Sequence, residues 1–221
     1  MEKENTLLNK FAFILVFLTL FSLPVSAHIY TGMVGFYDGF SHPVLGMDHF
    51  LAMVSVGIIS AQIGRHAIWT VPSTFVCVMI IGGIFGIIAE INKGLDDQVI
   101  TLSEVGSLNY FADYIYKIIE FGITLSVILL GLAISIEKKL SAVITIIFVG
   151  LFGLCHGAAH GLEMPWAANP IFFALGFISS TATLHLFGVG IGYFFIQSTI
   201  SSLLLRIIGL GCALYGCYLF L

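Results

Sequence analysis

The stretch HPVLGMDHFLAM, residues 42–53, places two histidines and an aspartate at the head of an apolar run. Ionisable side chains are expensive inside hydrocarbon, and those found within membrane segments are usually functional. The stretch therefore raises two linked questions. One is whether the run crosses a membrane, and the other is what keeps His42, Asp48 and His49 at its start.

The composition of the 221-residue chain answers the first question. Hydrophobic residues make up 59% of the chain and charged residues only 9%, whereas a soluble domain has about 25% charged residues. The mean hydropathy is +1.08. We therefore expect an integral membrane protein with the lipid bilayer as its surroundings. The 12 acidic and 8 basic residues give no indication of nucleic-acid binding.

The first 27 residues have the pattern of a secretory signal peptide. Lys3 and Lys10 give a basic start, FAFILVFLTLF is an apolar core, and LPVSA ends on the small residues that a signal peptidase requires. Cleavage after Ala27 would make His28 the new N-terminus, whose amine, following amide and imidazole form a compact chelating group. The alternative is an uncleaved signal anchor.

The remainder, residues 28–221, is predicted to be a single all-α domain of six transmembrane helices. Apolar runs of the length that a bilayer requires, about 20 residues, lie near 44–63, 67–89, 111–135, 140–161, 169–195 and 199–220. The connections are short except for a polar loop over about 90–110. A cleaved signal and the positive-inside bias both place the mature N-terminus and that loop outside the cytoplasm, with 137–139 inside.

The first motif, His-x5-Asp-His, has the residue types of a transition-metal site. Pro43 suits the first turn of a helix. His42 and His49 are seven residues apart and would share a helical face, with Asp48 beside it. Two imidazoles and a carboxylate are suitable ligands for a divalent transition ion. The alternative is structural, with His42 capping the helix and Asp48 bonded to a neighbouring helix.

A second cluster lies in GLCHGAAHGLEMP, residues 153–165, at the end of the predicted fourth span. His156, His160 and Glu163 fall on one helical stripe. A second stripe, of small residues that let another helix approach closely, consists of Gly153, Gly157 and Gly161. We expect these glycines to bring the cluster against the first span, so that the two motifs complete one metal site.

Two further ionisable residues lie deep within predicted spans. Glu120 could pair with Lys117 or line an inward path. His185 could be hydrogen-bonded in the core or contact a passing ion, and the nearby Thr181 and Thr183 could line the same path.

The sequence contains no nucleophile elbow, P-loop or dinucleotide fingerprint. No soluble domain is available to bind ATP, so a transporter would depend on an ion gradient, a membrane potential or a partner protein. These features predict a transporter and not an enzyme. Two alternatives use the same residues: an intramembrane zinc hydrolase that activates a water, and a haem protein with two helical histidines.

At these motifs the sequence resembles the HupE/UreJ family of hydrogenase and urease accessory proteins. The resemblance rests on HPVLGMDHFLAM, HGAAHGLEMP, EFGITLSVILLGL around Glu120 and ATLHLFGVGIGYF around His185. It covers essentially the whole mature chain. It implies a permease for Ni²⁺ or Co²⁺ in the bacterial inner membrane, with the metal as transported substrate and no prosthetic group. The family pattern assigns the function to His42, Asp48, His49, His156, His160 and Glu163.

We therefore expect a secondary permease that supplies metalloenzyme or cofactor assembly. His28 and His42 would receive the ion, the two motifs would hold it, and Glu120 and His185 would line the inward path. Imidazole suits nickel, cobalt, zinc and copper alike, so the ligands alone do not select the metal.

Overall fold

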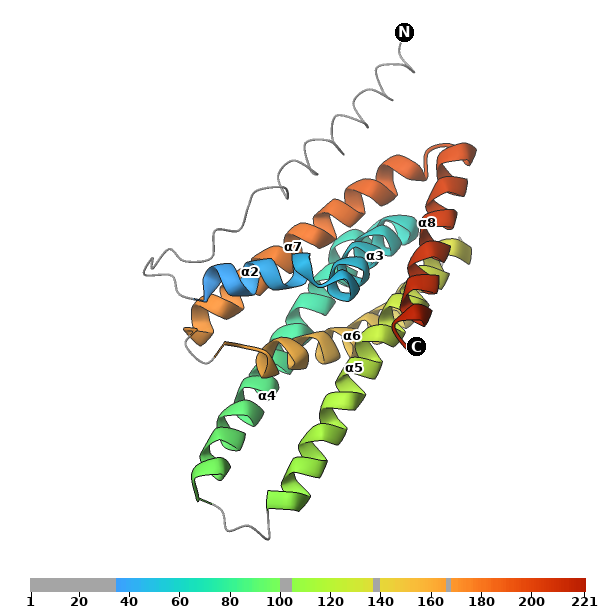
Figure 1. The fold of residues 1–221 in the computed structure, drawn as a ribbon. Helices are drawn as coiled ribbons and strands as arrows, with labels where there is room; N and C mark the ends of the chain where they lie inside the picture. Colours follow the sequence, from blue (N-terminus) through green and yellow to red (C-terminus); the bar gives the residue numbers. More distant parts are fainter. Residues whose placement is uncertain (1–34, 100–104, 137–139, 166–167) are drawn as a thin grey trace. The chain divides into compact units, whose positions relative to one another are not determined.

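The computed structural model describes residues 35–99, 105–136, 140–165 and 168–221, and this part of the chain is helical without strands (Figure 1). The helices are α2 (Phe36–Leu45), α3 (Met47–Ile63), α4 (Ala67–Val99), α5 (Val105–Ile136), α6 (Ala142–Leu162), α7 (Pro170–Phe195) and α8 (Thr199–Tyr218). The predicted signal peptide, residues 1–27, and His28 lie outside the described residues.

Five of the six predicted spans agree to within two residues with the apolar segments of the described helices. Five segments are each long and apolar enough to cross a membrane: Ala67–Glu90, Asp113–Ile136, Ala142–Leu162, Pro170–Phe195 and Thr199–Tyr218. Helices α2 and α3 together make a sixth. An all-α fold with up to six apolar spans is therefore confirmed for the described residues, and it is consistent with a membrane protein.

The first span differs from the single straight helix that we predicted. It is broken into α2 and α3, which meet at an angle of 80°. Gly46, between them, has extended backbone (φ −75°, ψ 106°), and its N–H bonds to the carbonyl oxygen of His42. Pro43 was expected in the first turn of a helix, but it lies inside α2. The predicted helix start is wrong because about two further helical turns, from Phe36 onwards, precede Pro43, and the chain bends at Gly46.

The predicted long polar loop at about 90–110 is also wrong in extent. Helix α4 continues to Val99 and α5 begins at Val105. Polar composition beyond the apolar span does not end a helix, because residues such as Glu, Gln and Lys have good helix propensity.

Opposing glycines bring four pairs of helices into backbone contact. A Cβ added to Gly57 of α3 would collide with the backbone of α7, and one added to Gly188 of α7 would collide with the backbone of α3. The same relation holds for α2 with α7, α4 with α6, and α5 with α8, through Gly39 and Gly176, Gly86 and Gly161, and Gly131 and Gly209. Small residues drive helix association in lipid, where close van der Waals packing replaces the hydrophobic effect.

We expected the glycine stripe of α6 to pack against the first span. This prediction is wrong, because the stripe packs against α4. A Cβ on Gly153 would lie 2.7 Å from the carbonyl oxygen of Phe75, and one on Gly157 would collide with the carbonyl of Met79. The close α4–α6 contact leaves the other side of α6, which carries His156 and His160, facing the bend between α2 and α3.

Candidate metal site

The bend at Gly46 brings the two histidines of the first motif together. His42 lies in the last turn of α2 and His49 in the first turn of α3, and their ring centroids are 5.5 Å apart in an edge-on arrangement. Their proximity was predicted, but the reason given was wrong. They do not share one helical face, because the chain turns by 80° between them.

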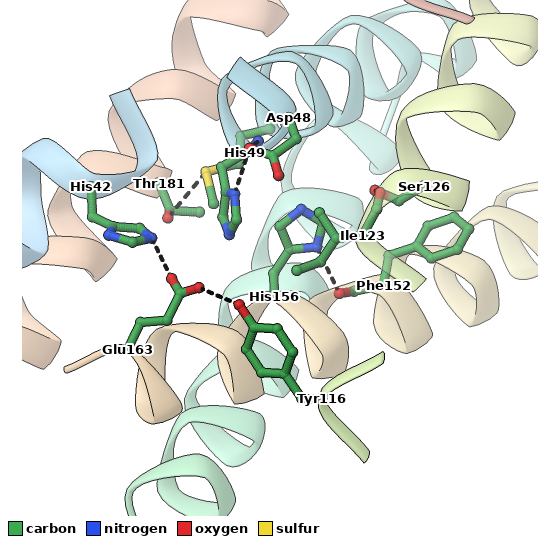
Figure 2. A network of polar contacts seen from close by, with 11 residues as sticks. His42, Asp48, His49, Tyr116, Ile123, Ser126, Phe152, His156, Glu163 and Thr181 are labelled. Atoms are coloured by element: carbon green, nitrogen blue, oxygen red, sulfur yellow. Dashed lines mark hydrogen bonds and ion pairs between the residues drawn. The ribbon is translucent and has the colours of Figure 1, made fainter. Parts of the chain in front are cut away.

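Asp48 holds the ring of His49 in one orientation (Figure 2). The Nδ1 atom of His49 lies 2.9 Å from Oδ1 of Asp48, and the same oxygen accepts the backbone N–H of His49 at 2.8 Å. A carboxylate can only accept, so Nδ1 carries the proton and donates it. In the neutral ring, Nε2 then keeps its lone pair. A carboxylate that fixes the tautomer of a histidine in this way is typical of the residues behind metal ligands.

His160 of α6 enters between the two histidines of the first motif. Its ring centroid is 4.9 Å from that of His42 and 4.9 Å from that of His49. One ring nitrogen from each of these three residues lies within 4.8 Å of the others. The ring of His160 is stacked on Phe177 of α7, with centroids 5.1 Å apart and planes 7° from parallel. The structure thus brings the two motifs into one cluster of side chains.

His156 lies one turn before His160 on the same side of α6. Its ring centroid is 4.9 Å from that of His49, and its Nδ1 lies 3.0 Å from the carbonyl oxygen of Phe152. Since a carbonyl only accepts, Nδ1–H is the donor, and Nε2 keeps its lone pair in the neutral ring. We call His42, His49, His156 and His160 the histidine cluster.

Glu163 closes the exposed side of the cluster. Its Oε2 lies 3.0 Å from Nε2 of His42, and both side chains are 32% exposed. The hydrogen bond with His42 lowers the pKa of Glu163, which ends α6 and lies outside the membrane spans. The hydroxyl of Tyr116 on α5 donates to the second carboxylate oxygen at 3.4 Å (Figure 2). An open cleft of about 410 Å³, lined in part by Asp38, His42 and Glu163, leads to this pair.

Ring nitrogens without partners distinguish this cluster from a hydrogen-bonded core. Among the described residues, Nε2 of His49, Nε2 of His156 and both ring nitrogens of His160 are buried and have no hydrogen-bond partner. His156 and His160 are 0% exposed. A buried polar atom without a partner costs about 1–3 kcal/mol. Lone pairs left free at this cost are available to a metal ion, so the donor set fits a divalent transition ion.

The structure places His185, one of the two deeper predicted residues, outside this cluster. His185 of α7 is 1% exposed, and its Nδ1 lies 2.8 Å from the carbonyl oxygen of Met53. Its ring packs edge-on against Phe75 at 5.0 Å, and Phe75 also contacts His156 at 5.4 Å. A single aromatic ring therefore separates His185 from the cluster.

Glu120 lies on α5 and interacts electrostatically with Glu163 and Asp48. The pairing of Glu120 with Lys117 that we considered is wrong, because the ammonium of Lys117 lies 2.7 Å from Oδ2 of Asp113.

Sequence reasoning missed the aromatic and thioether side chains around the cluster. Phe75, Phe177 and Tyr116 gave no signal, because aromatic residues are common throughout the chain. Of the two threonines, Thr181 is buried and its hydroxyl donates to the sulfur atoms of two methionines. Thr183 is exposed, and its hydroxyl donates within its own helix to the carbonyl oxygen of Ser179.

Comparison with known proteins gives two matches. The family model described as HupE / UreJ protein matches residues 16–106 and 98–219. The chain is 35% identical to Protein HupE of Rhizobium leguminosarum bv. viciae over 184 residues, which cover 82% of this chain and 84% of that protein. No solved structure matches the chain.

Proposed function

The chain belongs to the HupE/UreJ family, and from this premise we propose that it is a secondary permease for Ni²⁺ or Co²⁺ in the bacterial inner membrane. It moves the ion into the cytoplasm to supply metalloenzyme or cofactor assembly. The ion is the transported substrate, and the protein is not an enzyme and holds no prosthetic group. The mature N-terminus, beginning at His28, lies in the periplasm.

The observation that carries this proposal is a set of buried ring nitrogens that have no hydrogen-bond partner within the described ranges of the chain. His49, His156 and His160 together supply four such nitrogens. His42, His49 and His160 come from three helices, yet one nitrogen of each lies within 4.8 Å of the others. A core that used these histidines only for packing would pair their nitrogens, because leaving them unpaired costs stability.

The imidazole and carboxylate ligands of the site suit transient binding of a transported ion better than permanent binding. A permease must bind its ion weakly enough to release it, and imidazole with carboxylate is a weaker set than a thiolate cage. In this proposal, the ion enters at the cleft, where Asp38 and Glu163 attract it. It displaces the hydrogen bond between Glu163 and His42, and then occupies the site formed by His42, His49 and His160. His156 accepts it next, and Glu120 and His185 line the inward path.

The proposal is tested by uptake of radioactive nickel and cobalt into proteoliposomes that contain the purified protein. We expect saturable uptake above that of empty liposomes, with zinc and copper as competitors that reveal the selectivity. Variants His49→Ala and His156→Ala should lose it. His66→Ala should keep it, because His66 is exposed beyond the end of α3.

A protein that takes up neither metal in sealed liposomes of either orientation would contradict the proposal. Hydrolysis of the surrounding lipid by the zinc-loaded protein would replace it with the hydrolase alternative.

A further inference from the structure

One helical turn away from the histidine cluster, two methionine side chains contact the hydroxyl group of a threonine, and the three residues come from three different helices. The hydroxyl of Thr181 on α7 lies 3.4 Å from the sulfur of Met53 on α3 and 3.7 Å from the sulfur of Met79 on α4 (Figure 2 shows the first contact). All three side chains are 0% exposed. Buried methionines usually fill gaps in a core, but here both sulfur atoms converge on one polar group from different helices.

A buried imidazole, that of His185, bonds to the backbone of Met53, one of these two methionines. His185 follows Thr181 by four residues, so the two side chains lie on one stripe of α7. The Nδ1 of His185 donates to the carbonyl oxygen of Met53, the residue whose sulfur contacts Thr181. The Nε2 of His185 is buried and has no partner among the described residues.

The same spacing connects this group to the histidine cluster. Met53 follows His49 by four residues on α3, and Met79 follows Phe75 by four residues on α4. Each pair therefore lies on one helical stripe, about 6 Å apart along the axis. The ring of Phe75 contacts both His156 and His185. One helical turn beyond the cluster, the donors thus change from imidazole and carboxylate to thioether and imidazole.

We propose that Met53, Met79 and His185 form a second metal-binding site, which takes a soft or borderline cation through two thioether sulfurs and one imidazole nitrogen. Thioethers are soft ligands, which favour soft cations such as Cu⁺ and its analogue Ag⁺. The hydroxyl of Thr181 donates to the sulfur lone pairs, and a bound ion would accept these lone pairs in its place. Calling this a station on the transport path rests on the proposed function, but the binding itself is independent of it.

The test uses Ag⁺ as the probe and the full-length protein in detergent, with Cys77, Cys155, Cys212 and Cys217 replaced by alanine to remove competing thiols. Silver binding is measured by equilibrium dialysis, and silver-edge X-ray absorption identifies the neighbouring atoms. Met53→Leu/Met79→Leu is the test variant, because Leu and Met are close in volume and the exchange costs under about 1.5 kcal/mol. Met47→Leu is the matched control, since Met47 is 51% exposed.

We expect the parent and Met47→Leu to bind Ag⁺ with sulfur neighbours. The double variant should lose these neighbours and bind about tenfold or more weakly. If the double variant does not fold, the single variants Met53→Leu and Met79→Leu replace it in the test. Each is expected to bind Ag⁺ with an affinity between those of the parent and the double variant. Unchanged silver affinity in the folded variants, or only nitrogen neighbours in the parent, would overturn the inference. Failure of nickel and cobalt uptake in proteoliposomes would instead overturn the proposed function and leave this binding result standing.

Discussion

The Nδ1 atom of His49 donates to Oδ1 of Asp48 at 2.9 Å, so the opposite nitrogen of His49 points into the histidine cluster with its lone pair free. Asp48 is 28% exposed and His49 is 7% exposed by side chain, so the carboxylate stays near the surface while the imidazole is buried. The aspartate of the first motif therefore acts on the site through the histidine that follows it. A substitution at Asp48 that keeps the hydrogen bond but removes the charge can therefore test the two contributions to metal binding separately.

Asp48→Asn is expected to weaken the binding of Ni²⁺ or Co²⁺ without unfolding the protein. An asparagine oxygen can still accept the Nδ1–H bond, but it lacks the charge that makes the imidazole more basic and offsets the charge of the ion. Loss of such a supporting group typically costs about 10–100-fold in metal affinity. Titration calorimetry on purified protein measures the affinity, and uptake at matched expression measures transport. Asp113→Asn, at an exposed ion pair with Lys117, is the control. Equal affinities in the two variants would show that Asp48 has only a structural role.

Gly46→Ala is expected to disturb the site more than the fold. The backbone of Gly46 is not in the left-handed region, so alanine can adopt it. Its Cβ would lie 3.1 Å from Oδ1 of Asp48 and 3.3 Å from Nδ1 of His49, which crowds the pair that orients the ring. We expect metal affinity to fall several-fold while the melting temperature in detergent stays near that of the parent. A large loss of folded protein would instead assign Gly46 to the stability of the bend.

The sequence was sufficient to predict the spans because the bilayer imposes a length and a composition on each of them. It was also sufficient to select the histidines, since ionisable residues are rare in such segments. The bend at Gly46 was not predictable in the same way. The sequence around Pro43 and Gly46 is equally compatible with one straight helix that starts near residue 44 and with two helices that meet at Gly46. The partner of the α6 glycines was missed because every apolar helix offers a surface on which such a stripe could pack.

Gly157→Ala is expected to destabilise the protein strongly. Its Cβ would collide with the carbonyl of Met79 and lie 2.9 Å from the backbone nitrogen of Gly83, and neither backbone can move without separating α4 from α6. Overpacking costs about 1–3 kcal/mol, and more where backbone must shift. Gly211→Ala is the control, since no atom of the described residues lies within 4 Å of a Cβ there and alanine favours a helix by about 0.5–1 kcal/mol. Thermal unfolding in detergent compares the two, and equal melting temperatures would contradict the close packing.

The orientation of the chain is expected to follow its basic residues. In a background without the natural cysteines, single cysteines are placed within 90–110 and within 137–139 and exposed to an impermeant thiol reagent in intact spheroplasts. We expect labelling in the first range only, and N-terminal sequencing of the mature protein should begin at His28. Labelling of 137–139 alone would reverse the topology, and a protein that begins at Met1 would remove the chelating N-terminus.

His160→Leu is expected to abolish metal binding and yet raise the stability of the metal-free protein. Both ring nitrogens of His160 are buried and have no partner in the part of the chain that the structure describes, at a cost of about 1–3 kcal/mol for each such group. Leucine removes that cost and keeps an apolar contact with Phe177, on which the imidazole is stacked. The melting temperature of the metal-free variant should rise by about 2–4 °C for each kcal/mol recovered, whereas added Ni²⁺ or Co²⁺ should stabilise only the parent.

The combination of these two results separates a binding histidine from a packing histidine. A histidine retained for the core would lose favourable contacts on replacement, so the variant would melt at a lower temperature and respond to metal as the parent does. His66→Ala, at an exposed position, should change neither quantity. If His160→Leu melts below the parent and still gains stability from nickel and cobalt, His160 does not bind the ion, and the cluster must be reduced to His42, His49 and His156.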